Sequence, residues 1–67
     1  MTTDLDDRFG VTVHHARKLA ARAYVADAVI FGRDTHHTIV TVTGEGATRA
    51  AAEASCMGAA RAWVAMR

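Results

Sequence analysis

The sequence predicts a small α/β domain of the α+β type, in which two helices pack on an antiparallel β-hairpin. Three observations support this fold class. Apolar residues recur with a helical period in two segments, near 14–24 and near 49–65. Two runs rich in β-branched and aromatic residues, at 25–31 and 37–43, lie between these segments. A length of 67 residues limits the chain to one domain.

The size and composition predict a thin hydrophobic core. A domain of this length buries only about 60% of the surface that its unfolded chain exposes. Alanine provides 15 of the 67 residues, and each alanine buries little area. Cys56 is the only cysteine, so no disulfide within the chain can compensate. We therefore expect a homodimer or a complex with a protein partner.

The first residues lead into the domain. Residues 1–8 carry three aspartates around one leucine and are expected to form a flexible acidic leader before a single domain at 9–67. Phe9, Val11 and Val13 then alternate with Gly10 and Thr12, which predicts a short strand. Thr12 would equally suit the N-cap of a following helix, so two interpretations stay open at this point.

Residues 14–24 are predicted to form the first helix. At about 100° per residue, apolar residues between Val13 and Tyr24 fall on one arc and basic residues on the opposite arc. Continuing the same wheel would place Asp27 among the apolar residues, so the helix should end near Tyr24 or Val25. The opposite face carries His14, His15, Arg17, Lys18 and Arg22.

The runs VADAVIF at 25–31 and HTIVTVT at 37–43 are predicted to form a hairpin, because GRDT at 32–35 has turn chemistry. Both sets of alternating positions in the first run carry apolar side chains. A strand that is apolar on both faces needs cover on both sides. A second copy or a partner is expected to supply part of that cover.

The last segment is predicted to be a helix. Gly44 and Gly46 should end the second strand and let the chain turn. Thr48 is a suitable N-cap for a helix from about Arg49 to Ala65.

This helix carries what we call the small-residue ridge, four small residues at successive i+4 positions: Ala50, Ala54, Gly58 and Ala62. Such a ridge allows another backbone to approach closely. In one interpretation the ridge lies on the hairpin of the same chain. In the other it contacts the helix of a second copy, with Trp63 and Met66 as hydrophobic anchors.

Residue types that bind metals or catalyse reactions are present without the spacing that such sites need. The four histidines form two adjacent pairs, and adjacent side chains point apart, so each pair offers one ligand to a given metal. Cys56 lies mid-helix among small residues, where a thiol behaves as a small hydrophobic group. No phosphate-binding or dinucleotide-binding motif occurs. We therefore expect no catalytic residue, no metal site and no cofactor.

Composition also bears on location and partners. The first ten residues lack a basic start and an apolar run, and nowhere do 18 apolar residues follow one another, so a cytoplasmic protein without a membrane span is expected. A net charge of +1 is too small to argue for nucleic acid by itself. The excess of arginine over lysine, with abundant alanine, is typical of GC-rich coding, as in actinobacteria or their phages.

Residues 40–63 read VTVTGEGATRAAAEASCMGAARAW. This segment resembles the last strand, glycine loop and closing helix of double-stranded-RNA-binding domains, and it covers about a third of the chain. The resemblance matches Gly44 and Gly46 with the loop glycines, Thr48 with the capping serine, Arg49 with the first phosphate-binding lysine and Ala52 with an alanine of the closing helix. Ala50 stands where the second lysine would be.

The leading hypothesis is a non-enzymatic module that self-associates and blocks or bridges a protein partner through exposed apolar surface. Its expected interface consists of Ala50, Ala54, Gly58, Ala62, Trp63 and Met66. The alternative is a duplex RNA-binding or DNA-binding protein that contacts phosphates through Arg17, Lys18, Arg22 and Arg49. Because the chain is nearly neutral, nucleic acid is the less favoured partner.

Overall fold

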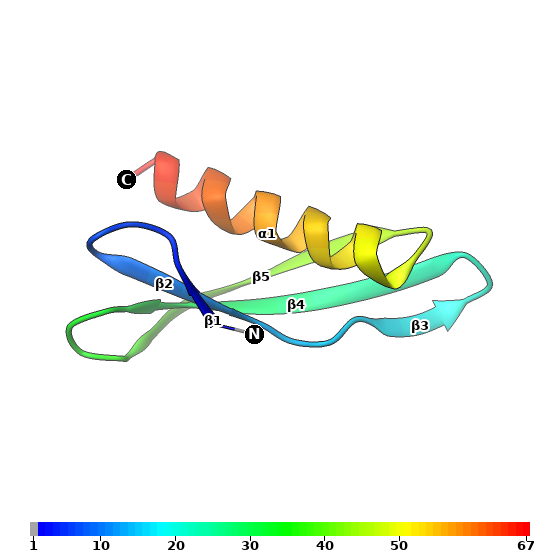
Figure 1. Ribbon diagram of the computed structural model, residues 1–67, viewed down its shortest axis with the longest axis horizontal. Helices are drawn as coiled ribbons and strands as arrows, with labels where there is room; N and C mark the ends of the chain where they lie inside the picture. The colour runs from blue at the N-terminus through cyan, green and yellow to red at the C-terminus, as the bar shows by residue number, and fades with distance from the viewer. Residues whose placement is uncertain (1) are drawn as a thin grey trace.

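The computed structural model describes residues 2–67, which form an antiparallel five-stranded sheet covered on one face by one helix (Figure 1). Strand β4 is central, because β2 and β3 pair with successive parts of one of its edges and β5 pairs with the other. Strand β1 extends the sheet beyond β2. In chain order the elements are β1 (Thr2–Asp4), β2 (Phe9–Val13), β3 (Arg17–Ala20), β4 (Ala23–Gly32), β5 (Thr38–Gly46) and α1 (Arg49–Ala65).

The predicted order of helix, hairpin and helix is wrong, because residues 14–24 form a short link, β3 and the start of β4 instead of a helix. Arg17 pairs with Val25, and Lys18 pairs with Tyr24, across a tight turn. The predicted apolar arc is a weak helix signal, since three of its six residues are alanine; the six are Val13, Ala16, Leu19, Ala20, Ala23 and Tyr24. Its largest aliphatic side chain, Leu19, is 67% exposed. Pairing with β4 satisfies the backbone of this segment and overrides its modest helix propensity.

The other strands follow the sequence pattern more closely. The first of the two runs predicted to form a hairpin lies within β4, and all of the second except His37 lies within β5. The two strands pair antiparallel, and both are longer than predicted. Residues 9–13 form β2, so the strand interpretation holds and Thr12 is not a helix cap. Val11 pairs with Ile30 and Val13 with Ala28, which places these valines on the face beneath α1.

Part of the segment expected to be a flexible acidic leader belongs to the sheet. Thr2 to Asp4 pair with β2, and Asp6 closes the turn between the two strands. The carboxylate of Asp6 accepts hydrogen bonds from the N–H groups of Arg8 at 2.7 Å and Phe9 at 2.8 Å. The bond from Arg8 is the main reason why the pKa of Asp6 lies below its ordinary value.

The closing helix is confirmed at the predicted residues, Arg49–Ala65. Thr48 has an extended backbone, and its side-chain oxygen accepts a hydrogen bond from the N–H of Ala51 at 3.1 Å. This bond satisfies one of the N–H groups that a helix start leaves without an intrahelical partner.

Gly44 and Gly46 lie in β5 rather than in a turn, so their predicted role is wrong. Neither has a positive φ, so neither is needed for a left-handed backbone. Both instead allow α1 to approach the strand. A Cβ at Gly46 would lie 2.6 Å from the backbone nitrogen of Ala52, and a Cβ at Gly44 would overlap the backbone of Cys56. The helix backbone therefore rests directly on β5.

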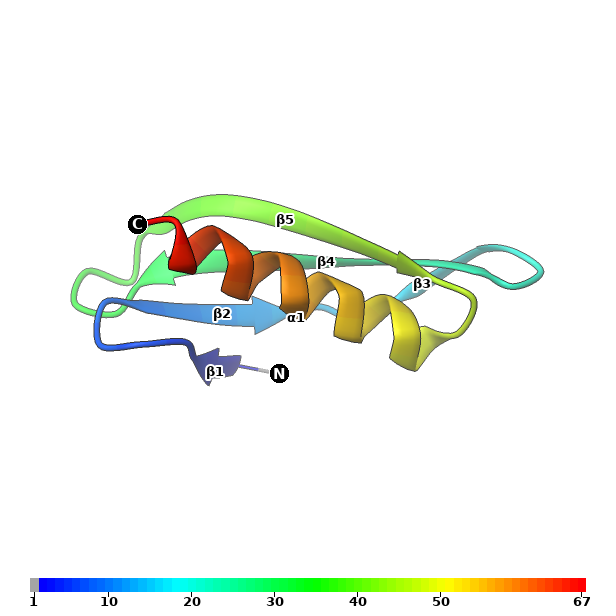
Figure 2. The same ribbon diagram turned by 90° about the horizontal axis from the view of Figure 1, so that it is seen from above.

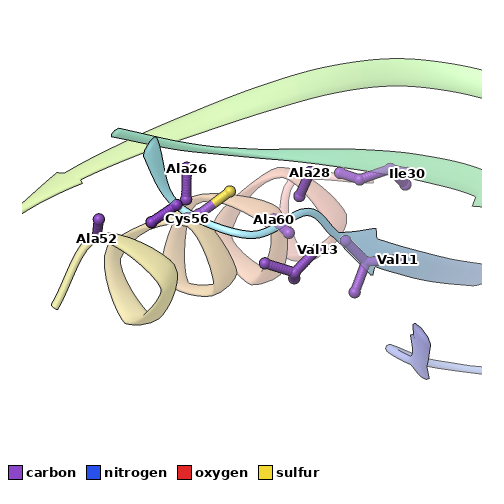
Figure 3. Close-up of a cluster of buried hydrophobic side chains, with 9 residues drawn as sticks. Val11, Val13, Ala26, Ala28, Ile30, Ala52, Cys56 and Ala60 are labelled. Carbon is purple, nitrogen blue, oxygen red and sulfur yellow. The ribbon is translucent and has the colours of Figure 1, made fainter. Parts of the chain in front are cut away.

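The core is built from small side chains at this contact (Figure 3). Ala52, Cys56 and Ala60 lie along the underside of α1, each fully buried. They meet side chains from the covered face of β2 and β4: Val11, Val13, Ala26, Ala28 and Ile30. The alanine-rich composition thus serves a close helix-to-sheet contact, in which many small groups are packed at short range.

We expect Gly44→Ala to lower the free energy of unfolding by about 1–3 kcal/mol, because the added methyl group must displace the backbone of α1. Gly58→Ala is the matched control on the opposite side of the helix, where a Cβ would meet nothing within 4 Å. That control should raise stability by about 1 kcal/mol through helix propensity. Urea denaturation followed by circular dichroism measures both changes, and a neutral Gly44→Ala would contradict the close contact.

Candidate functional site

The open face of the sheet is the side that α1 does not cover (Figure 1). Along β4, even-numbered residues point towards the helix and odd-numbered residues point to the open face. The odd positions are Val25, Asp27, Val29 and Phe31, all of them half-buried. The structure therefore presents a mostly apolar row along the middle of this face.

Threonines and one aromatic contact surround that row. Thr12 pairs with Val29 on one side, and Thr41 pairs with it on the other. The ring of Phe31 lies over Gly10, where a Cβ would be 2.8 Å from its Cε2 atom. His36 stacks on the same ring with centroids 6.2 Å apart. A shallow hollow of about 400 Å³ lies beside these groups and is lined in part by Thr12, Val29, Phe31 and His36.

Charges on the open face are balanced. The guanidinium of Arg17 lies 3.5 Å from the carboxylate of Asp27. At the other end of the sheet, Arg33 lies 3.3 Å from the carboxylate of Asp4. The middle of the face therefore has little net charge, and a partner could cover it at a modest cost in desolvation.

The structure places the predicted small-residue ridge at the surface. Ala50, Ala54, Gly58 and Ala62 are all exposed. The stripe that packs on the sheet lies two positions further along the helix, at Ala52, Cys56 and Ala60. The interpretation in which the ridge itself lies on the hairpin is thus wrong, and its predicted contact with a second copy stays a prediction.

The two predicted hydrophobic anchors, Trp63 and Met66, differ in how far their side chains are exposed. Trp63 packs edge-on against Phe9 with ring centroids 5.3 Å apart, and the guanidinium of Arg67 lies 4.2 Å from the centre of its ring. Trp63 therefore closes the core of its own chain at the end of α1. Met66 is 84% exposed and remains accessible.

The four basic residues predicted to contact phosphates come from a strand, a turn and the start of α1, and the predicted first helix that was to carry three of them is absent from the described residues. Arg17 and Lys18 lie in β3, Arg22 lies in the turn after it, and Arg49 begins α1. The tip of the β3–β4 hairpin and the start of α1 lie at the same end of the molecule (Figure 1). Arg22 and Glu45 line one hollow there, so acidic groups accompany the basic ones.

Histidines do not gather into a ligand set in the part of the chain that the structure describes. No three His, Cys, Asp or Glu side chains of residues 2–67 are arranged to hold a metal ion. His14 and His15 follow β2 and border a groove of about 340 Å³ between this link and α1. Glu53 and Met57 form its other wall, and Glu53 accepts a hydrogen bond from the N–H of Ala16 at 3.1 Å. Glu53 therefore ties the link to the helix.

Cys56 is a core residue. It is fully buried, and its Sγ atom lies 3.7 Å from the carbonyl oxygen of Val42. Burial, and to a lesser degree the negative charge of Asp27, raise the pKa of the thiol above its ordinary value. Both effects disfavour the thiolate, which is the nucleophilic form.

Sequence reasoning missed the extent of the open face and the outer edge of β5. Alternation in AYVADAVIFG at 23–32 could have indicated the two faces of β4, because the one charged residue, Asp27, falls at the odd positions, whereas Ala26 and Ala28 fall at the even positions. The edge position of β5 depends on pairing between distant segments, which no local pattern encodes.

Comparison of the chain with protein-family models, with curated proteins and with solved structures gave no match. Among residues 2–67, no helix combines the length and apolar character that crossing a membrane requires.

We expect the thiol of Cys56 to resist labelling by a thiol-reactive dye at mildly alkaline pH, where an exposed cysteine would react, because burial and a raised pKa both limit thiolate exposure. The same sample in concentrated urea should label fully. The reagent releases a coloured group when it reacts with the thiol, and the absorbance of that group measures the extent of labelling. Fast stoichiometric labelling of the folded protein would show that α1 does not stay on β5.

Proposed function

We propose that this protein is a non-enzymatic module that self-associates and binds a partner protein through the open face of its sheet. One observation carries the proposal: the face opposite α1 presents the half-buried row of Val25, Val29 and Phe31, with β-branched neighbours and paired charges. A mostly apolar surface whose charges are paired is suited to contact with another protein.

The thin core supports the same proposal. The fully buried side chains are small, with Ile30, Val11 and Cys56 the largest among them. A domain of this size gains stability when further surface is covered by a partner. Covering the open face would bury the apolar row at about 25 cal/mol for each Å² of apolar surface removed from water. Binding and stabilisation would therefore be coupled.

We expect Val29→Lys to prevent capture of a protein partner, because the charge would have to be desolvated in the middle of the contact. The test uses the purified chain as bait in extracts treated with nuclease, with Ala47→Lys as control because it adds the same charge at an exposed loop position. A discrete protein retained by the wild type and the control, and lost with Val29→Lys, is the expected result. Equal capture by all three baits would contradict the open face as the binding surface.

Nucleic-acid binding is the second candidate. The β3–β4 hairpin and the start of α1, which carry Lys18, Arg22 and Arg49, lie at the same end of the molecule, and this favours it. Basic side chains of this kind could contact phosphates. Two facts weigh against it: Arg17 is already paired with Asp27, and Glu45 lies beside Arg22. Stacking aromatics are also few, since the chain has two Phe, one Tyr and one Trp.

We expect no gel shift of duplex RNA or duplex DNA at low salt, with the protein at tens of micromolar. Salt dependence would expose any phosphate contacts, since each one adds to the slope of affinity against salt. A shift that disappears with Lys18→Glu and Arg22→Glu, and persists with Val29→Lys, would favour this second candidate over protein binding.

A further inference from the structure

The outer edge of β5 is an unpaired strand edge. In the chain from Thr2 to Arg67, no strand pairs with β5 on the side away from β4. Figure 2, which looks down on the helix, shows β5 running along the border of the sheet. At nine residues, β5 is much longer than the three-residue β1 and the four-residue β3. It therefore offers the most extended edge of the sheet.

The direction of its backbone groups follows from two hydrogen bonds. The N–H of His14 donates to the carbonyl of Asp27 at 2.9 Å, so the backbone N–H and C=O groups of Asp27 point towards the β2 side of β4. The N–H of Gly32 donates to the carbonyl of His37 at 3.0 Å, so the backbone groups of Gly32 point towards the β5 side of β4. Backbone groups alternate along an antiparallel strand. The even-numbered β4 residues thus bond to the even-numbered residues of β5.

The N–H and C=O groups of three successive odd-numbered residues of β5 consequently point outwards: Thr41, Thr43 and Glu45. Devices that usually protect such an edge are scarce here. The segment has no proline and no lysine, its one charge is Glu45, and its bulge lies near Ile39 at the far end. An edge of this kind is a template for another strand.

We infer that a second copy of this chain pairs with β5 through its own β5, antiparallel about a two-fold axis at Thr43. This register lets all three outward residues of each copy take part, with Thr43 opposite Thr43 and Thr41 opposite Glu45 of the second copy. Like charges do not meet across the axis. A two-fold contact of this kind closes on itself and yields a dimer rather than a fibre.

The flank of α1 leaves room for this arrangement. Glu53 and Met57 face the link after β2, so the opposite flank of the helix faces the outer edge of β5. That flank carries Ala51, Ser55 and Ala59, none of them large or charged. In the dimer the two helices lie antiparallel on one side of the joined sheet, and small side chains allow helix axes to approach within about 8–10 Å.

The inference rests on the self-association proposed above and names its surface. It moves the contact from the small-residue ridge to the adjacent flank and to the strand edge beneath it. It also joins the two open faces into one surface twice as wide, which leaves Val29 of each copy accessible.

Sedimentation equilibrium up to high micromolar concentration tests the inference with the full chain. The wild type should be a dimer. Thr43→Pro removes an outward N–H without breaking the ladder to β4, and Thr43→Lys places like charges opposite each other at the axis. Each should raise the dissociation constant at least about tenfold. Thr12→Lys, the same change on an inner strand of the same face, and Gly58→Leu, on the ridge, should leave the dimer intact.

Circular dichroism determines whether each variant is folded. If Thr43→Pro does not fold, Thr43→Lys alone tests the contact. A dimer that resists both Thr43 variants and is broken by Gly58→Leu would overturn the β5 contact while supporting self-association through the ridge. A wild type that stays monomeric throughout the concentration range would overturn the β5 contact and self-association together. Open-face binding of a partner would still be judged separately, by the Val29→Lys bait.

Discussion

The close approach of α1 to β5 is the contact on which the rest of this structure depends. Gly44 and Gly46 leave the strand without side chains where the helix crosses it, and Ala52 and Cys56 bring the helix backbone down onto it. Dispersion contacts at such short range are numerous, although each is weak. They let a chain with few large side chains hold a helix on a sheet.

This contact also determines which surfaces stay accessible. Because the stripe of Ala52, Cys56 and Ala60 faces the sheet, the small-residue ridge faces away from it. With one helix among the described residues, one face of the sheet is covered and the other is left open. Because α1 lies over β4 and β5, the outer edge of β5 lies beside the helix flank that carries Ala51, Ser55 and Ala59. The proposed binding face and the proposed dimer edge are therefore consequences of one packing arrangement.

Local sequence signals predicted the elements that local chemistry determines. Thr48 marks the start of α1, and the β-branched runs mark β4 and β5. The predicted first helix does not form, because an alanine-rich arc has no helix preference strong enough to resist pairing with β4, in which Arg17 pairs with Val25. The sequence predicts a turn at Gly44 and Gly46 because glycine can indicate either a flexible backbone or a position where a side chain would not fit. Only the packed helix distinguishes these two uses. Small residues occur on several faces of α1, so the sequence does not show which of them are buried. The predicted small-residue ridge lies two positions before the buried residues Ala52, Cys56 and Ala60.

The contact between α1 and β5 can be observed directly by nuclear magnetic resonance of the isotope-labelled protein. We expect nuclear Overhauser effects from the α protons of Gly44 to the amide proton of Cys56, and from those of Gly46 to the amide proton of Ala52. If both signals are absent from a well-resolved spectrum of the folded protein, α1 does not rest on β5. The positions inferred from that contact for the ridge, the open face and the dimer edge would then be contradicted together.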